Sequence, residues 1–327
     1  IQIIRLYYNM IQTVCGDIEN NKLGICMTHE HVWCDQSLGP KFYLFDNSRD
    51  KNSLMLLNDY NKQLSELKLY KQYKGNSLVE VTCEGWGRDL NILYKLSKKS
   101  KVHIIATTGF YTKPCIPNHA YKFNVNKLSD YLVKEIEVGN ENNIKCGILK
   151  TSVNTARVEG IEEKGLKAVA KAQKITGVSI TTHTTGSRRQ EIKGGNASYE
   201  ILDYLMSEGV KPEKLIFGHV DERPDIRLLK KSAKKGSYIQ FDTVGKEHWL
   251  LDKTRADLIK ALIDFGFLNK ILISQDRNRY YEMTYGGNKG YCNILDNFVL
   301  KLKNVGITNS QINQIIISNP QKALERN

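Results

Sequence analysis

Short apolar runs alternate along this chain with longer stretches of helical periodicity, and this alternation limits the fold more than any other feature. Eight such runs occur: LGICM (23–27), LVEVT (78–82), VHIIATTG (102–109), CGILKT (146–151), VSITTHT (178–184), LIFGHV (215–220), YIQFDTV (238–244) and ILISQD (271–276). Between two of them, Leu166, Val169 and Ala170 fall near one face of a segment that Gly177 should end. Strands alternating with helices predict a parallel sheet, and eight repeats predict a closed (β/α)8 TIM barrel of the α/β class.

The alternative architecture is an open, doubly wound parallel sheet. That fold usually has a glycine-rich phosphate turn after its first strand, whereas this chain has THEHVWCD (28–35) there. The closed barrel is therefore favoured. The segment TVCGDIENNKLGICM (13–27) predicts a short N-terminal β-hairpin with its turn at ENN, and the leucines of the long first connection (35–77) predict helix.

The chain has 327 residues, a length that one barrel can account for. With no Pro- or Gly-rich linker, we predict a single domain over 10–327, preceded by an extension (1–9) without function. No apolar run approaches the roughly 18 residues of a membrane span, and the first residues do not resemble an export signal. Seven cysteines without a CxxC pair argue against disulfides and thiolate zinc sites, so we expect a reducing cytoplasm.

The formal net charge of +13 comes mainly from lysines at positions expected on polar helix faces. Nucleic-acid binding would require a basic patch interleaved with aromatic residues or a known module, and neither is found in the sequence. We therefore predict neither a nucleic acid nor a membrane as partner. A surplus of positive charge favours a small anionic substrate instead.

Four of the seven histidines lie at or just beyond the end of a predicted strand: His29, His31, His183 and His219. Asp276 ends the eighth run in the same way. Because the carboxyl ends of barrel strands converge on one mouth, these side chains should lie together. His29 and His31 are two residues apart, so on an extended backbone they point to the same side. Imidazole and carboxylate ligands suit zinc, manganese, iron or cobalt, and two adjacent ions would activate water.

Lys150, in GILKT, is unusual beside these residues because a buried ammonium is costly and cannot bind a metal. One interpretation is structural: the lysine pairs with a carboxylate or extends outwards. The other is chemical. Burial can lower the pKa of a lysine until its neutral amine captures carbon dioxide, and the resulting carbamate has two oxygens that can bridge two cations.

From about Met10 to its end, the chain also resembles a known family. The motifs that carry the resemblance are IQTVCGDI (11–18), LGICMTHEHV (23–32), EGWGRD (84–89), ATTGFY (106–111), GILK (147–150), TTHT (181–184), FGHVDE (217–222) and ILISQD (271–276). Their order and spacing are similar to those of the phosphotriesterase-like branch of the amidohydrolase superfamily. The resemblance implies that His29, His31 and Asp276 hold a buried metal ion and that His183 and His219 hold a more exposed one.

By the same resemblance, a carbamate on Lys150 and a hydroxide bridge the two divalent ions, with zinc the first expectation and manganese, cobalt or iron the others. The hydroxide would attack a carbonyl or phosphoryl centre, and Asp276 would carry the proton to the leaving oxygen. Tyr111 stands where lactone-hydrolysing relatives place a tyrosine near the hydroxide; its alternative role is packing at the barrel rim. Relatives in this branch are often dimers, so a homodimer is a further expectation.

The residues in the loops after the predicted strands indicate the class of substrate. Thr243 stands where phosphotriesterases carry a histidine and acyl-homoserine lactonases an arginine, which argues against both activities as the main one. Cations and aromatic residues gather in the loops instead, although some of the cations should pair with nearby carboxylates. The predicted substrate-binding residues are Lys246, Arg277, Arg279, Tyr280, Trp33 and Arg223. We therefore expect a lactonase that opens a small anionic lactone, specifically a phosphorylated sugar lactone.

Three alternatives stay open. An organophosphate or N-acyl-homoserine lactone hydrolase would need an apolar loop after the eighth strand, where NRYYEMTYGGNKGY (278–291) is polar and cationic. An amidase or deacetylase would differ only in the leaving group, and a non-catalytic metal-binding barrel lies outside the enzyme class. The motif EGWGRD is assigned to structure, with Gly85 and Gly87 allowing a tight turn and Asp89 capping a helix, and it is left out of the catalytic set.

Overall fold

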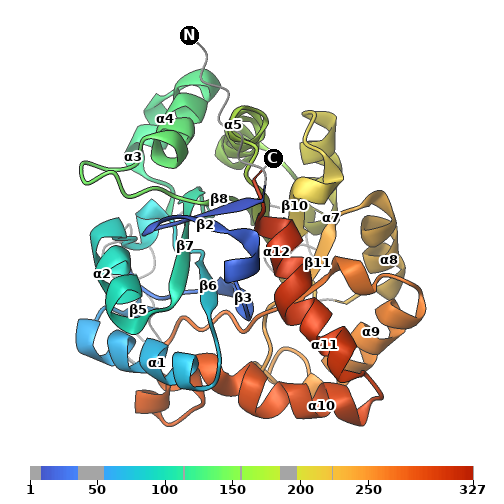
Figure 1. The fold of residues 1–327 in the computed structure, drawn as a ribbon. Coiled ribbons are helices and arrows are strands. Elements are labelled where there is room, and N and C mark those ends of the chain that lie inside the picture. The colour runs from blue at the N-terminus through green and yellow to red at the C-terminus, as the bar shows by residue number, and fades with distance from the viewer. Residues whose placement is uncertain are drawn as a thin grey trace, which may run out of the picture.

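Eight parallel strands form one sheet at the centre of the molecule, and helices surround it (Figure 1). The structure is a computed structural model that describes residues 9–35, 55–112, 115–154, 157–184, 197–222 and 224–326. The sheet strands are β3 (Cys26–Glu30), β6 (Ser77–Glu80), β7 (His103–Gly109), β8 (Ile148–Val153), β9 (Ile180–Thr184), β10 (Leu215–Phe217), β11 (Tyr238–Phe241) and β12 (Ile271–Ile273). Each of the eight predicted runs contains or overlaps one of these strands, so the predicted TIM barrel is confirmed.

Each strand of the sheet lies beside the next one in sequence order, from β3 to β12. The pairing is parallel throughout, as the register between Thr107–Gly109 of β7 and Ile148–Lys150 of β8 illustrates. The ring closes between β12 and β3, where the backbone N–H of Asp276 donates to the carbonyl of His29 at 3.1 Å. The strands are buried along almost their whole length, which explains their continuous apolar character in the sequence.

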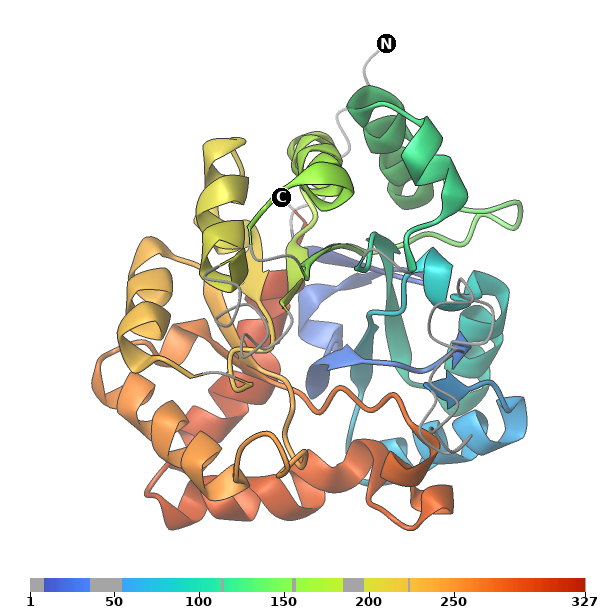
Figure 2. The ribbon, with the colours of Figure 1, turned by 180° about the vertical axis from the view of Figure 1, so that it is seen from behind.

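The surrounding helices are α1 (Tyr60–Gln72), α2 (Leu90–Ser100), α3 (Asn118–Lys122), α4 (Val125–Glu137), α5 (Gly160–Thr176), α7 (Ala197–Ser207), α8 (Ile226–Lys235), α9 (Asp252–Asp264), α10 (Val299–Asn304), α11 (Asn309–Asn313) and α12 (Asn319–Leu324). Figure 2 shows the same ring of helices from the opposite side. Asp89 caps α2 by accepting the backbone N–H of Ile92, and Gly177 ends α5 at a φ of 72°, both as predicted. None of the helices in the described part of the chain is both long and apolar enough to cross a membrane.

The N-terminal hairpin is present, but its turn is not where the sequence predicted it. β1 (Met10–Thr13) pairs with β2 (Gly16–Glu19), and the chain reverses at residues 14–15 before Gly16, whose φ is +106°. The prediction of a turn at ENN is wrong because Glu19 is the last residue of β2 and the two asparagines begin a short 3-10 helix after the hairpin. The hairpin lies beside α12, where Arg326 donates its backbone N–H to the carbonyl of Met10 at 3.0 Å (Figure 1).

Within the long first connection, α1 confirms the helix predicted at Leu64 and Leu67. The prediction of helix at Leu56 and Leu57 is wrong, because these residues form β5 (Leu56–Leu57), which pairs with β4 (Cys34–Asp35) as a small antiparallel sheet. Leu54 lies outside the described residues.

Four strands (β6, β10, β11 and β12) end earlier than their apolar runs predicted, and at β10 and β12 side chains take over the hydrogen bonds of the backbone. β10 ends at Phe217, and the next two backbone N–H groups donate to Thr182 Oγ1 and Asp242 Oδ1. β12 ends at Ile273, and the N–H of Gln275 donates to Glu30 Oε1 at 2.9 Å. The chain can therefore leave the sheet at these points without leaving buried donors unpaired.

Candidate metal centre

Six of the polar residues singled out by the sequence meet in one cavity at the carboxyl ends of the strands. His29 lies in β3 and His31 just beyond it, Lys150 in β8 and His183 in β9. His219 follows β10 by two residues, and Asp276 follows β12 by three. All six line the same cavity of about 150 Å³. The convergence predicted from strand ends is therefore realised.

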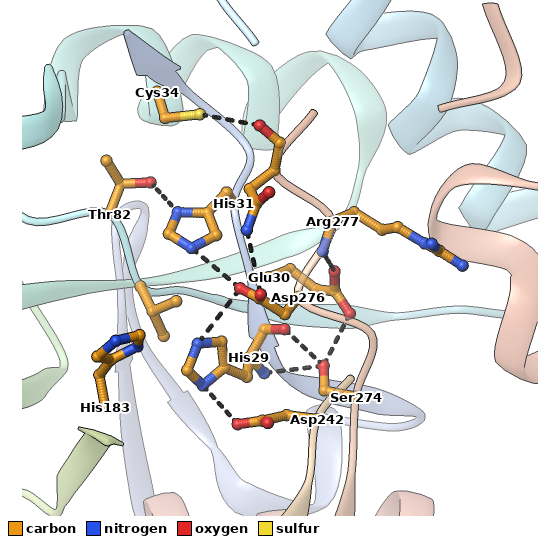
Figure 3. Close-up of polar contacts among 12 residues, drawn as sticks. His29, Glu30, His31, Cys34, Thr82, His183, Asp242, Ser274, Asp276 and Arg277 are labelled. Atoms are coloured by element: carbon orange, nitrogen blue, oxygen red, sulfur yellow. Dashed lines mark hydrogen bonds and ion pairs between the residues drawn. The ribbon is translucent and has the colours of Figure 1, made fainter. Parts of the chain in front are cut away.

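One group of donors consists of His29, His31 and Asp276 (Figure 3). Asp276 Oδ1 lies 3.2 Å from His31 Nε2 and 3.6 Å from His29 Nε2. The Nε2 atom of His29 is buried and has no hydrogen-bond partner among the described residues. Two ring nitrogens and one carboxylate oxygen therefore face one another within the reach of a single ion.

The other group consists of His183 and His219, with Lys150 nearby. His219 Nε2 lies 2.6 Å from His183 Nδ1, and the two rings are nearly perpendicular. His183 also contacts the hydroxyl of Tyr111 through Nε2, at 3.1 Å. Lys150 is 1% exposed and donates through Nζ to the carbonyl of Val81 at 3.0 Å.

Burial sets the charges of these groups. It lowers the pKa of His31 to about 3 and also lowers the pKa values of His29, His183 and Lys150. Although burial opposes it, the ammonium of Lys246 holds the pKa of Asp276 well below its usual range. Neutral imidazoles and an ionised carboxylate are the protonation states that metal binding requires.

His219 differs from the other three histidines. Burial lowers its pKa too, but the Asp242 carboxylate outweighs burial and raises that pKa to about 9. His219 Nε2 and His183 Nδ1 are 2.6 Å apart, so these two nitrogens can share one proton. A cation bound by both nitrogens would replace that proton.

The donor set fits divalent metal ions. The unpartnered Nε2 of His29, the carboxylate oxygen aimed at two imidazoles, and the close pair of histidine nitrogens are all arrangements that a bound cation resolves. Imidazole nitrogen and carboxylate oxygen are ligands of zinc, manganese, cobalt and iron. The lowered pKa of Lys150 favours the neutral amine from which a carbamate forms.

Aromatic side chains form the walls of the cavity. Trp86 is 3% exposed, and its ring lies 4.1 Å from that of Tyr111 and 5.3 Å from that of His31. From the sequence, EGWGRD was predicted to have only a structural role, and the place of Trp86 in the cavity wall was not predicted. The turn itself was correctly interpreted: a Cβ on Gly85 would lie 1.6 Å from the carbonyl oxygen of Cys115, which only glycine avoids. Trp249 also lines the cavity and is half exposed.

Two predicted substrate-binding cations line the cavity, and one does not. Lys246 is buried and donates to both the carboxylate and the carbonyl of Asp276, at 2.6 and 2.5 Å. Arg279 lines the cavity as well. Arg277 is 1% exposed, is not among the described residues that line the cavity, and extends away from the histidines (Figure 3). The φ of Asp276 is +50°, and this backbone turn sends the next side chain to the other side.

The other predicted rim residues lie elsewhere. Tyr280 is 38% exposed and packs against the ring of Tyr285, and Trp33 packs against the core; neither is among the described cavity residues. Arg223 lies outside the described residues. Thr243 is buried, and its hydroxyl bonds Asp221 and the guanidinium of Arg255. It therefore braces a loop rather than facing the cavity.

Comparison with known proteins gives a consistent assignment. A family model described as the Phosphotriesterase family matches residues 9–324. The N-acetyltaurine hydrolase of Danio rerio is 30% identical, over 96% of this chain and 97% of that protein. A crystal structure of the phosphotriesterase homology protein from Escherichia coli, complexed with phosphate in its active site, has a TM-score of 0.83 and 26% identity, over 93% of this chain and 99% of that one. A lactonase structure from Listeria monocytogenes shares the fold, with a TM-score of 0.87 and 24% identity, over 97% of this chain and 99% of that one.

Proposed function

The chain belongs to the phosphotriesterase family, and from this premise we propose that it is a hydrolase that uses two divalent metal ions to cleave an acyl bond in a small anionic molecule. One observation carries the proposal: six potential metal-binding side chains converge in a small cavity that Lys246 and Arg279 also line. The volume suits a small substrate, and the two cations suit an anionic one.

In this proposal, His29, His31 and Asp276 would hold one ion and His183 and His219 the other, and a carbamate formed on Lys150 would supply a further oxygen ligand. Zinc is the first candidate, with manganese, cobalt and iron as alternatives. When bound, such a pair polarises the scissile carbonyl and lowers the pKa of water towards neutrality.

Residues of the chain would transfer the proton, position the substrate and exclude water. Asp276 is ionised, so its carboxylate can accept the proton of the attacking water and pass it to the leaving group. Lys246 holds that carboxylate in place through Oδ2 and, with Arg279, attracts the anionic group of the substrate. Trp86 and Tyr111 exclude water from one wall. The hydroxyl of Tyr111, directed at His183, holds that ring in position.

Two substrate classes follow. The first is an amide between a short acyl group and a small anionic amine, which the relatives named N-acetyltaurine hydrolase favour. The second is the phosphorylated sugar lactone expected from the sequence, which the position of Tyr111 in the cavity and the two cations favour. In both, water attacks a carbonyl carbon, and the two classes differ in whether nitrogen or oxygen leaves.

The test compares matched substrates on protein loaded with zinc or manganese. We would assay N-acetyltaurine against N-acetylethylamine, which lacks the sulfonate, and a sugar lactone with and without its phosphate. A higher kcat/KM for the charged member of at least one pair is expected, with about two metal ions per chain. Equal kcat/KM values within both pairs would refute the anionic substrate, and a fully active metal-free protein would refute the metal mechanism.

A further inference from the structure

Asp242 is a buried carboxylate that the sequence analysis did not single out, and it lies behind the metal centre. It follows β11 directly, is 0% exposed and is not among the described residues that line the cavity. Its Oδ2 atom lies 3.0 Å from Nδ1 of His29, and its Oδ1 atom lies 2.7 Å from Nδ1 of His219. Figure 3 shows the contact with His29. Each carboxylate oxygen therefore contacts one imidazole.

We interpret these contacts as hydrogen bonds between side chains and not as a third metal-binding site. The three residues have ligand atoms within 4.8 Å of one another, but 2.7 and 3.0 Å are direct hydrogen-bond distances. The amide nitrogen of Gln240 donates to Oδ2 of Asp242 at 2.9 Å and also lies 3.1 Å from Nδ1 of His29. The carboxylate is thus already surrounded by donors.

The direction of these bonds determines the tautomer of both rings. An ionised carboxylate can only accept, so Nδ1 of His29 and Nδ1 of His219 must each carry the proton. In the neutral form of each ring, which metal binding requires, the Nε2 atom is then the one with the lone pair. Both face the cavity, His29 Nε2 towards Asp276 and His219 Nε2 towards His183.

Asp242 also holds the backbone of His219. The φ of His219 is +54°, in the left-handed region that residues other than glycine rarely adopt. Oδ1 of Asp242 accepts the backbone N–H of His219 at 2.9 Å as well as its ring nitrogen. The preceding residue has to be small, because a Cβ on Gly218 would lie 2.9 Å from Asp242 Oδ2 and 2.4 Å from the carbonyl of Thr182.

His31 provides a contrast. Its Nδ1 contacts the hydroxyl of Thr82 at 2.7 Å, and a hydroxyl can donate or accept. Thr82 therefore supports one ligand of one site, whereas Asp242 supports one ligand of each site.

We infer that Asp242 is a positioning residue shared by the two metal sites, and that it couples them by fixing the Nδ1-protonated tautomer of His29 and of His219. The inference rests on the two-ion part of the proposed function. Its consequence is that removing this one carboxylate weakens both sites together, although Asp242 binds neither ion.

The experiment measures metal affinity rather than activity. Co²⁺ would be titrated into metal-free wild type, Asp242→Asn and Thr82→Val in competition with a chelator, giving two dissociation constants for each protein. An asparagine keeps the shape but offers one acceptor and no charge, so D242N should weaken both constants by about 10- to 100-fold. T82V should weaken one constant only.

Retention of either wild-type constant in D242N would overturn the shared role. Wild type that binds fewer than two ions would instead overturn the proposed function from which the inference starts.

A second measurement does not depend on the variant folding. In zinc-loaded wild type labelled with ¹⁵N-histidine, NMR of the ring nitrogens distinguishes the two tautomers. We expect protonated Nδ1 in both His29 and His219. Protonation at Nε2 in either ring would overturn the inference.

Discussion

Arg255 offers the sharpest test of how the cavity is held together. It lies in α9, is 0% exposed, and donates from Nε to Asp221 at 2.7 Å and from Nη1 to Asp252 at 2.9 Å. It also donates to the carbonyls of Leu250 and Lys246. The guanidinium therefore joins Asp221, two residues beyond His219, to the loop that carries Lys246 into the cavity.

Substituting Arg255→Met keeps much of the volume and removes the charge, which leaves buried Asp221 without its cation and Asp252 with only Lys301, 3.7 Å away. Breaking a buried ion pair from one side typically costs about 3–5 kcal/mol. Whole domains are stable by only about 5–15 kcal/mol, so this loss is a large part of the total. Urea unfolding followed by circular dichroism would measure it.

Two further variants make the measurement specific. Asp221→Asn added to R255M should recover part of the lost stability, because it removes the uncompensated charge of Asp221. Lys253→Met breaks the exposed pair between Lys253 and Asp257 on the same helix and should leave the unfolding midpoint unchanged. If R255M unfolded at the same urea concentration as K253M, or if D221N deepened the loss, the reasoning about the buried cation would be refuted.

Three other predictions concern the cavity. Removing metal with a chelator should abolish hydrolysis and lower the melting temperature, and adding zinc back should restore both; a melting temperature indifferent to the chelator would contradict a bound ion. Trp249→Ala should raise KM several-fold with little change in melting temperature, because half of this side chain is exposed and the rest lines the cavity; steady-state kinetics and calorimetry would show it. Arg279→Ala should lower kcat/KM for the charged member of each substrate pair by about tenfold and leave the neutral member unchanged, and an equal loss for both would argue against anion recognition.

The fold and the convergence of the candidate ligands could be predicted because both follow from local patterns. Buried parallel strands have continuous apolar sequences, and the carboxyl ends of barrel strands always converge. A histidine at a strand end is therefore placed in space by its place in the sequence. This is why His183 and His219, far apart in the chain, were brought together correctly.

Residues whose role depends on neighbouring strands could not be predicted in this way. Asp242 falls inside the run 238–244 and looked like part of a strand, and only the closed ring places it beneath His29 and His219. Arg277 was expected at the rim because it follows Asp276. Nothing in the sequence indicates that Asp276, which is not a glycine, adopts a left-handed backbone that turns the next side chain away.

Buried carboxylates accept hydrogen bonds from the irregular loops at the mouth of the regular barrel. Glu30 accepts from Ser274 Oγ and from the backbone N–H groups of Gln275 and Arg277, which links β3 to the loop after β12. Glu80 accepts the backbone N–H groups of Trp33 and Thr82, and Asp242 accepts the backbone N–H of His219.

In each case the carboxylate satisfies backbone donors at a point where the strands no longer pair. None of the three is among the described residues that line the cavity. The candidate ligands can therefore leave the sheet geometry at the barrel mouth because these buried acids accept the backbone hydrogen bonds that the sheet no longer makes.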